Sequence, residues 1–234
     1  MLLFEMSLIL SPRVRALWYL LFAVWAHQRG RGWIVPKSVP LNERIVEYPF
    51  IHSNLGDVKQ GENILDVGAG VSRLPIELAS RGFNIWTIDL NPHPFPRKHP
   101  CFTPTQGDIR RTGFKDNFFD KVIAVSTVEH IGLKKGERDH EGDKKALREI
   151  LRIIKPGGEV LVTVPFGRQA IWHSTRTYDL PSLQEPFSGF EIKRVEYAME
   201  RAGNWVPASV EEVKNIAFSK SCKAVAMVVA QAVK

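Results

Sequence analysis

The sequence has little cysteine, no long hydrophobic run and no long block of charge of one sign. Its only cysteines are Cys101 and Cys222, so the disulfide framework of a small secreted domain is excluded and a reduced, cytoplasmic protein is favoured. The uncharged segment 16–26 has 11 residues. As a helix it would measure about 17 Å, too short for a hydrocarbon core of roughly 30 Å.

Charge is present, but it is dispersed. The net charge is +7 and the pI is near 9.5, which favours contact with anions. The basic residues nevertheless occur as scattered pairs, such as Arg110-Arg111 and Lys144-Lys145, and no basic block or internal repeat is visible. This dispersion is typical of a solvated surface, so nucleic acid is not the expected partner.

Residues 1–40 form an apolar segment that is predicted to be a helical extension. The first interpretation is a helix packed on the domain or on a second subunit, as in a homodimer. The second is a peripheral membrane helix at 14–28, with aromatic residues such as Trp18 and Trp25 at the headgroup boundary. The third is a cleaved signal, against which "MLLFEMSLIL" argues, because it is apolar, carries Glu5 and is not a basic leader.

Residues 41–234 show alternating strand and helix patterns, which predict one α/β domain. Apolar, β-branched runs indicate strands near 64–67, 83–89, 102–109, 121–128 and 159–166. Helical periodicity lies between them, most clearly at 143–154 before the breaker "KPGG". We therefore predict a Rossmann-like, doubly wound, mostly parallel sheet. Two late strand-like runs, "FEIKRVEYAM" and "KAVAMVVAQAV", predict an antiparallel pair at its end.

The segment "NILDVGAGVSRLP", 63–75, reads as a strand that turns into a helix through a glycine loop. It fails the dinucleotide pattern G-x-G-x-x-G at the third glycine. Asp66, Asp89 and Asp108 follow at the ends of three successive strands, where open parallel sheets bind ligands. Three acids around one cleft suit a cofactor that is cationic or rich in hydroxyl and amine donors.

These segments, together with "FFDKVIAVSTVEHIG" and "LREILRIIKPGGEVLVTVPFG", resemble the class I S-adenosylmethionine-dependent methyltransferases. Within that family the sequence is most similar to the small-molecule, type 11-like branch, over about residues 65–167. The resemblance implies a seven-stranded sheet with an antiparallel C-terminal hairpin. It also implies S-adenosylmethionine as cofactor and S-adenosylhomocysteine as product.

The family's cofactor roles map onto nine positions of this sequence. The resemblance implies a loop under the methionine part, an acid on the ribose hydroxyls, contacts to adenine and a backbone position near the methyl group. The loop residues are Asp66, Gly68, Ala69 and Gly70, and the acid on the ribose is Asp89. The adenine contacts are Leu90, Asp108 and Ile109, and the backbone position near the methyl group is Ser126.

His130 is the first candidate for a general base and Glu129 the second, because both follow the fourth strand in "STVEHIG". The alternative is that this pair is structural and holds the loop over the cofactor. Candidate acceptor contacts follow the fifth strand or lie in the late loop: His173, Arg176, Tyr178 and Trp205. No metal site is predicted, since His93, His99 and Cys101 lack a fourth ligand.

The function predicted from the sequence is methyl transfer to oxygen or nitrogen of a small molecule, sugar or lipid-linked acceptor, by in-line displacement. The first alternative is a nucleic-acid (RNA) methyltransferase, although "STVEH" lacks the Asn/Asp-Pro-Pro-aromatic loop of amino-directed base methylases. The others are a protein methyltransferase, a nicotinamide oxidoreductase and a non-catalytic S-adenosylmethionine-binding module.

Overall fold

The computed structural model describes residues 42–92, 99–134, 136–217 and 223–234. Short β-branched runs form the strands, as their alternation with helical segments predicts. In chain order the first elements are α3 (Arg44–Leu55), β1 (Asn63–Val67), α4 (Leu74–Ser80), β2 (Asn84–Asp89), β3 (Phe102–Gln106), β4 (Phe119–Val125), η2 (Val128–His130) and α5 (Gly142–Ile153). They are followed by β5 (Ile154–Pro165), β6 (Ala170–Trp172), β7 (Thr175–Thr177), α6 (Leu180–Gln184), η3 (Glu185–Phe187), β8 (Phe190–Arg201), β9 (Asn204–Ala208), α7 (Val210–Val213) and β10 (Ala224–Ala232).

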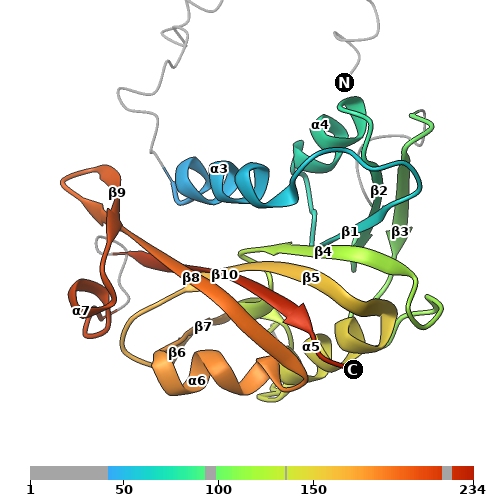
Figure 1. Cartoon of the computed structure of the whole chain (residues 1–234). Coiled ribbons are helices and arrows are strands. Elements are labelled where there is room, and N and C mark those ends of the chain that lie inside the picture. The colour runs from blue at the N-terminus through green and yellow to red at the C-terminus, as the bar shows by residue number, and fades with distance from the viewer. Residues whose placement is uncertain (1–41, 93–98, 135, 218–222) are drawn as a thin grey trace, which may run out of the picture. The chain divides into compact units, whose positions relative to one another are not determined.

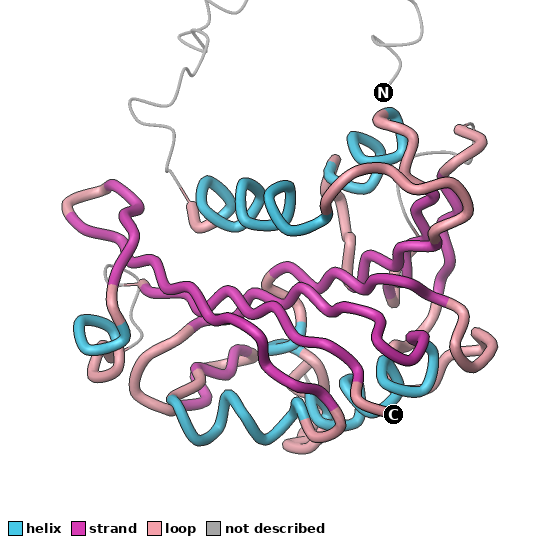
Figure 2. Tube along the Cα trace, in the orientation of Figure 1, coloured by secondary structure: helices cyan, strands magenta, loops and turns pink. Residues whose placement is uncertain are grey.

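The fold is built on one eight-stranded sheet in the order β3-β2-β1-β4-β5-β10-β8-β9. Figure 2 shows its strands in magenta between the helices. Strands β3 to β5 of this order are all parallel, with Leu65 of β1 opposite Trp86 of β2 and Val122 of β4. The chain runs outward from β1 through β2 to β3 and then returns to β4. The carboxyl ends of β1 and β4 therefore flank the point where the strand order reverses, which is where such sheets bind ligands.

The end of the sheet is antiparallel. β10 pairs antiparallel with both β5 and β8, so it lies between them (Figure 1). This confirms the predicted Rossmann-like sheet and its late antiparallel strands. β9 lies in a segment that the sequence predicts as a loop. It pairs with the end of β8 and adds an eighth strand to the predicted seven.

Helices cover both faces of the sheet, with α3 and α4 on one face and α5 and α6 on the other (Figure 1). Each face has its own apolar core. One contains Ile51 of α3, Leu78 of α4 and Ile64 of β1; the other contains Leu147 of α5 and Val162 of β5. Two layers of helix on a buried sheet explain why the central strands are apolar on both sides.

The predicted extension, 1–40, lies outside the described residues. No helix in the described part of the chain is both long and apolar enough to cross a membrane. The prediction of membrane contact at 14–28 stays a prediction.

Candidate functional site

The glycine loop after β1 is built on positive backbone angles. Gly68 has φ 70° and Gly70 has φ 52°, a region that glycine adopts without steric cost. A Cβ added to Gly68 would lie 2.3 Å from Cγ2 of Thr127. The Gly68 amide donates to the carbonyl of Ile88 (2.8 Å). The first glycine is thus required because the loop after β1 lies directly against the segment after β4.

Asp66 is the acid of β1 and is 3% exposed. Burial raises its pKa to about 7, the positive charge of Arg44 opposes this rise, and the negative charge of Asp89 adds to it. A buried carboxyl of this kind is stabilised in its charged form by a cation at the same site.

Asp89 ends β2 and contacts the glycine loop. Its Oδ2 accepts a hydrogen bond from the amide of Gly70 (3.1 Å), and its Oδ1 accepts one from the amide of Asn91 (2.8 Å). These two bonds fix the carboxylate and leave lone pairs on both oxygens. A fixed carboxylate with free acceptor capacity is suited to a pair of hydroxyl donors.

A cavity of about 270 Å³ opens at the carboxyl ends of β1, β2 and β4. Val67, Ile88 and Ile131 contribute apolar walls. Of the nine predicted cofactor residues, six line this cavity: Gly68, Asp89, Leu90, Asp108, Ile109 and Ser126. The other three, Asp66, Ala69 and Gly70, belong to the loop and strand around Gly68 and are not among the lining residues.

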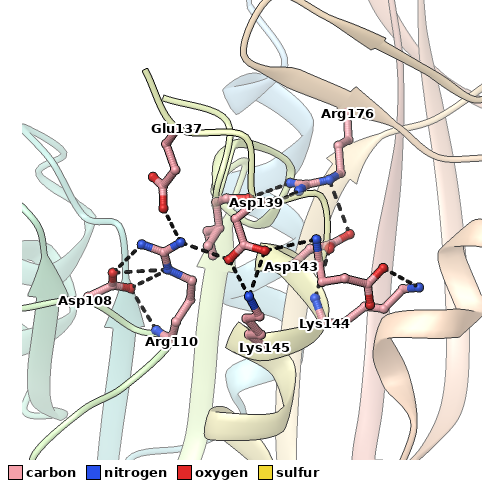
Figure 3. A network of polar contacts seen from close by, with 10 residues as sticks. Asp108, Arg110, Glu137, Asp139, Asp143, Lys144, Lys145 and Arg176 are labelled. Carbon is pink, nitrogen blue, oxygen red and sulfur yellow. Dashed lines mark hydrogen bonds and ion pairs between the residues drawn. The ribbon is translucent and has the colours of Figure 1, made fainter. Parts of the chain in front are cut away.

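Asp108 forms an ion pair that the sequence analysis did not predict (Figure 3). Both of its oxygens accept from Arg110, with Nη2 at 2.6 Å from Oδ2. These hydrogen bonds lower the pKa of Asp108. Arg110 also contacts Glu137, and its Nη1 lies 3.1 Å from Oδ2 of Asp139. Arg110 therefore joins the segment after β3 to the loop that follows η2.

Ser126 stands at the end of β4 with φ 43°, an uncommon angle for a residue with a side chain. Its amide donates to the carbonyl and the hydroxyl of Thr163, both at 3.0 Å. Its hydroxyl donates to Oε1 of Glu47 (2.7 Å), which also accepts from the Thr163 hydroxyl (2.7 Å). Glu47 is fully buried and is paired with Arg44. Helix α3 is thereby anchored to the ends of β4 and β5.

His130 and Glu129, the predicted catalytic pair, lie next to each other in η2. Nδ1 of His130 is 2.7 Å from the carbonyl oxygen of Ser174. Because a carbonyl only accepts, Nδ1 carries the proton of the neutral ring and Nε2 holds its lone pair. Nε2 lies 3.7 Å from Oε1 of Glu129. Burial, and to a smaller extent the charges of Glu47 and Glu43, raise the pKa of Glu129 well above its ordinary value.

A second cavity, of about 240 Å³, shares Ser126 and His130 with the first. Its remaining lining residues come from α3 and the residue before it, η2, β5, β7, β9 and the start of β10: Glu43, Arg44, Glu129, Pro165, Thr175, Trp205, Lys223, Ala224 and Val225. Two cavities that meet at Ser126 and His130 can hold two reactants side by side.

Of the four predicted acceptor contacts, only Trp205 lines the second cavity. Arg176 is 5% exposed, and its guanidinium donates to the carbonyls of Ile131 (2.6 Å) and Asp139 (2.9 Å). The Tyr178 hydroxyl donates to Asp143 (2.9 Å). The polar groups of Arg176 and Tyr178 are thus used within the protein, and their roles as acceptor contacts stay predictions. His173 sits at the β6–β7 turn and lines neither cavity.

Sequence reasoning missed the contribution of α3. Arg44 and Glu47 lie in "RIVEYPFIHSNL", where a buried face of Phe50, Ile51 and Leu55 also includes Glu47. A glutamate on the apolar face of an amphipathic helix is the signal that could have indicated it. Arg110, two residues after Asp108, gave no comparable signal.

This chain is similar in sequence to known methyltransferases. Residues 65–162 match the family described as "Methyltransferase domain". Demethylmenaquinone methyltransferase of Renibacterium salmoninarum is 31% identical over 105 residues, which cover 44% of this chain and 40% of that protein. Phosphoethanolamine N-methyltransferase 3 of Arabidopsis thaliana is 31% identical over 144 residues, 55% of this chain and 27% of that protein. The chain thus spans less than half the length of either relative.

A solved structure is similar over nearly the whole chain. It is Burkholderia thailandensis 1,6-didemethyltoxoflavin-N1-methyltransferase with 1,6-didemethyltoxoflavin and S-adenosylhomocysteine bound. The TM-score is 0.58 at 15% identity, covering 96% of this chain and 92% of that one. At this identity the likeness establishes the fold.

Proposed function

Because residues 65–162 belong to the class I S-adenosylmethionine-dependent methyltransferases, we propose that this protein transfers a methyl group to nitrogen or oxygen of an acceptor. The acceptor is a small molecule, a sugar or a lipid-linked compound. One observation carries the proposal above the others. Asp89 is held at the rim of the first cavity by the amide of Gly70, in the position where a carboxylate can accept from a ribose diol.

The residues of the first cavity fit this cofactor. Ile88, Leu90 and Ile109 offer apolar surface for a flat ring, and Asp89 offers acceptors for the hydroxyls. Asp66 lies in the strand beside this cavity and has a pKa of about 7, so a cationic amine there would stabilise its charged form. When bound, S-adenosylmethionine supplies an electrophilic methyl group on a cationic sulfur.

The protein's own task is alignment and proton removal. Ser126 and His130, shared by both cavities, mark where the reacting atoms meet. Positioning of this kind reaches effective molarities of roughly 10⁵ M or more. His130, with Nδ1 tied to the Ser174 carbonyl, presents Nε2 as a proton acceptor. General-base catalysis contributes about 10²- to 10⁴-fold.

The similar proteins are named for methylation of demethylmenaquinone, phosphoethanolamine and 1,6-didemethyltoxoflavin. These acceptors differ so widely that the family alone does not choose among them. A lipid-linked acceptor would agree with membrane contact at 14–28, and a soluble one with packing of that segment.

Calorimetric titration with S-adenosylmethionine and S-adenosylhomocysteine tests the cofactor step. We expect micromolar binding by the wild type and a loss of about tenfold or more in Asp89→Ala, since a hydrogen-bonded charge is removed. Asp57→Ala is the matched control, because Asp57 is exposed and lines neither cavity. A folded wild type that binds neither compound would overturn the proposal and favour a degenerate or regulatory module that has lost the cofactor site.

A further inference from the structure

The second cavity is polar. Among its 11 lining residues only Pro165, Trp205, Ala224 and Val225 have mainly apolar side chains. An acceptor that is mainly hydrocarbon would leave the carboxyls and cations of this cavity without water or partners, which is unfavourable. The lining therefore selects for a ligand with polar groups of its own.

Three buried polar atoms of this cavity have no hydrogen-bond partner among the described residues. They are Oε2 of Glu43, Oε2 of Glu129 and Nε1 of Trp205. Buried polar atoms are nearly always paired, so an unpaired one indicates a missing partner. The two carboxyl oxygens call for a hydrogen-bond donor, whereas the indole N–H calls for an acceptor. Glu129 is the most informative of the three, because its side chain is only 2% exposed.

The lining of this cavity carries both acids and cations. Arg44 is paired with Glu47, which is itself fully buried. Neither Glu43 nor Glu129 forms an ion pair with a lysine or arginine among the described residues, and Glu129 has only Nε2 of His130 nearby, at 3.7 Å from its Oε1. Lys223 lines the same cavity and forms no ion pair with any residue that the structure describes. A ligand that carries both a cation and an anion or carbonyl oxygen would complement the two acids, Glu43 and Glu129, and the cation of Lys223.

On the basis of the proposed function, we propose that the acceptor is a small primary amine that also carries an anionic or carbonyl oxygen, and that the amine nitrogen is methylated. Glu129 and Glu43 receive the N–H donors of the amine. Trp205 and Lys223 contact the oxygen-bearing end. The nitrogen then lies beside His130, where the two cavities meet.

The chemical step balances with the groups named. The ammonium form of the acceptor gives one proton to Nε2 of His130. The freed nitrogen lone pair forms the new N–C bond to the methyl group while the C–S bond breaks and its electron pair stays on sulfur. The products are a methylated ammonium and S-adenosylhomocysteine, and His130 returns its proton to water.

In the test, the protein is incubated with isotope-labelled S-adenosylmethionine and one acceptor at a time. The acceptors come in matched pairs, in which one member has an amine where the other has a hydroxyl. Suitable pairs are 2-aminoethyl phosphate with 2-hydroxyethyl phosphate, and 3-aminopropanoate with 3-hydroxypropanoate; propylamine lacks the anionic group. Mass spectrometry locates the methyl group. We expect N-methylation of at least one anionic amine and none of the hydroxyl partners or of propylamine.

Variants then separate the roles of the residues. Glu129→Gln and Glu43→Gln should each lower kcat/KM for the amine by about tenfold or more, with S-adenosylhomocysteine affinity unchanged. Lys223→Met should raise KM for the anionic amine with little change in kcat. Glu62→Gln is the matched control: Glu62 also has an unpaired buried oxygen in the described chain but lines neither cavity.

Methyl transfer to oxygen or carbon would overturn this inference. So would a protein that binds S-adenosylhomocysteine but methylates no amine, or a Glu129→Gln variant as active as the wild type. A folded wild type that does not bind S-adenosylhomocysteine overturns the proposed function itself, and with it the inference.

Discussion

At the scale of single residues, Asp66 has a pKa raised by burial from 3.8 to about 7. Between these values the folded carboxyl keeps its proton while the unfolded one releases it. Unfolding therefore releases a proton, and the free energy of unfolding falls as pH rises through this window. Over about three pH units the loss amounts to at most about 4 kcal/mol. Asp66→Asn removes this contribution.

Urea unfolding of the ligand-free protein at pH 4.5 and pH 8 measures the effect. We expect Asp66→Asn to gain stability relative to the wild type as pH rises, while its affinity for S-adenosylmethionine falls. Asp57→Asn should run parallel to the wild type, because Asp57 is exposed. Parallel curves for Asp66→Asn as well would show that Asp66 titrates normally.

The sequence predicts the roles of residues at strand ends and in tight loops better than the roles of residues whose partners are distant in the chain. Asp89 and Gly68 were identifiable because strand ends and tight loops have local signatures. Arg176 was assigned to the acceptor from its place after the fifth strand. Its guanidinium is instead used by the carbonyls of Ile131 and Asp139, about 40 residues away along the chain. No local pattern encodes such a partner.

At the scale of elements, the loop between β1 and α4 depends on Gly68. In Gly68→Ala the new methyl group would overlap the side chain of Thr127. The alanine would also have to adopt a φ of 70°, which strains the backbone of a residue with a Cβ. We expect about 2–4 kcal/mol of destabilisation, measured by chemical denaturation, and weaker cofactor binding.

Two comparisons identify the cause of that loss. Gly113→Ala should change stability little, because Gly113 has ordinary φ and open space around it. Adding Thr127→Ala to Gly68→Ala should restore part of the stability, since the nearest atoms are those of the Thr127 side chain. A double variant no more stable than Gly68→Ala would exclude the steric explanation.

Element types were predictable where periodicity was strong. The parallel strands and α5 follow from β-branched runs and from a stripe of Leu147, Ile150 and neighbours. β9 was missed because "NWVPA" is short and contains Pro207, which is depleted in strands. Its pairing with β8 is a tertiary contact that local propensity does not specify.

At the scale of the whole molecule, Arg176 connects β7 to the loop after η2 and, through Asp143, to α5 (Figure 3). Arg176→Met would leave the buried Asp143 without a cation and would remove the Arg176 donor from the carbonyls of Glu129 and Ile131. The Asp139 carbonyl would keep the amide of Gly142 as its donor. We expect a loss of about 3–5 kcal/mol in the free energy of unfolding.

The matched control is Arg168→Met, because Arg168 is exposed. It should change the urea midpoint little. If Arg176→Met instead keeps its midpoint and raises KM for the acceptor, the guanidinium contacts the acceptor, as the sequence predicts, and does not mainly stabilise the fold.

The match of residues 65–162 to the methyltransferase domain agrees with the predicted family, and the solved neighbour agrees with the predicted fold. The first cavity could be foreseen because its residues follow successive strand ends. The second could not, because its lining joins Glu43, Glu129, Trp205 and Lys223 from segments far apart in the chain. Such a site exists only once the sheet and its covering helix have come together.

The position of β10 also has a consequence for synthesis. This strand is the last of the sheet to leave the ribosome, yet it lies between β5 and β8. Until residues 224–232 emerge, the nascent sheet has an open gap with two unpaired strand edges, β5 and β8. Lys223, Ala224 and Val225 of the second cavity arrive at the same moment. The protein thus acquires its complete sheet and its second cavity together, at the end of translation of this domain.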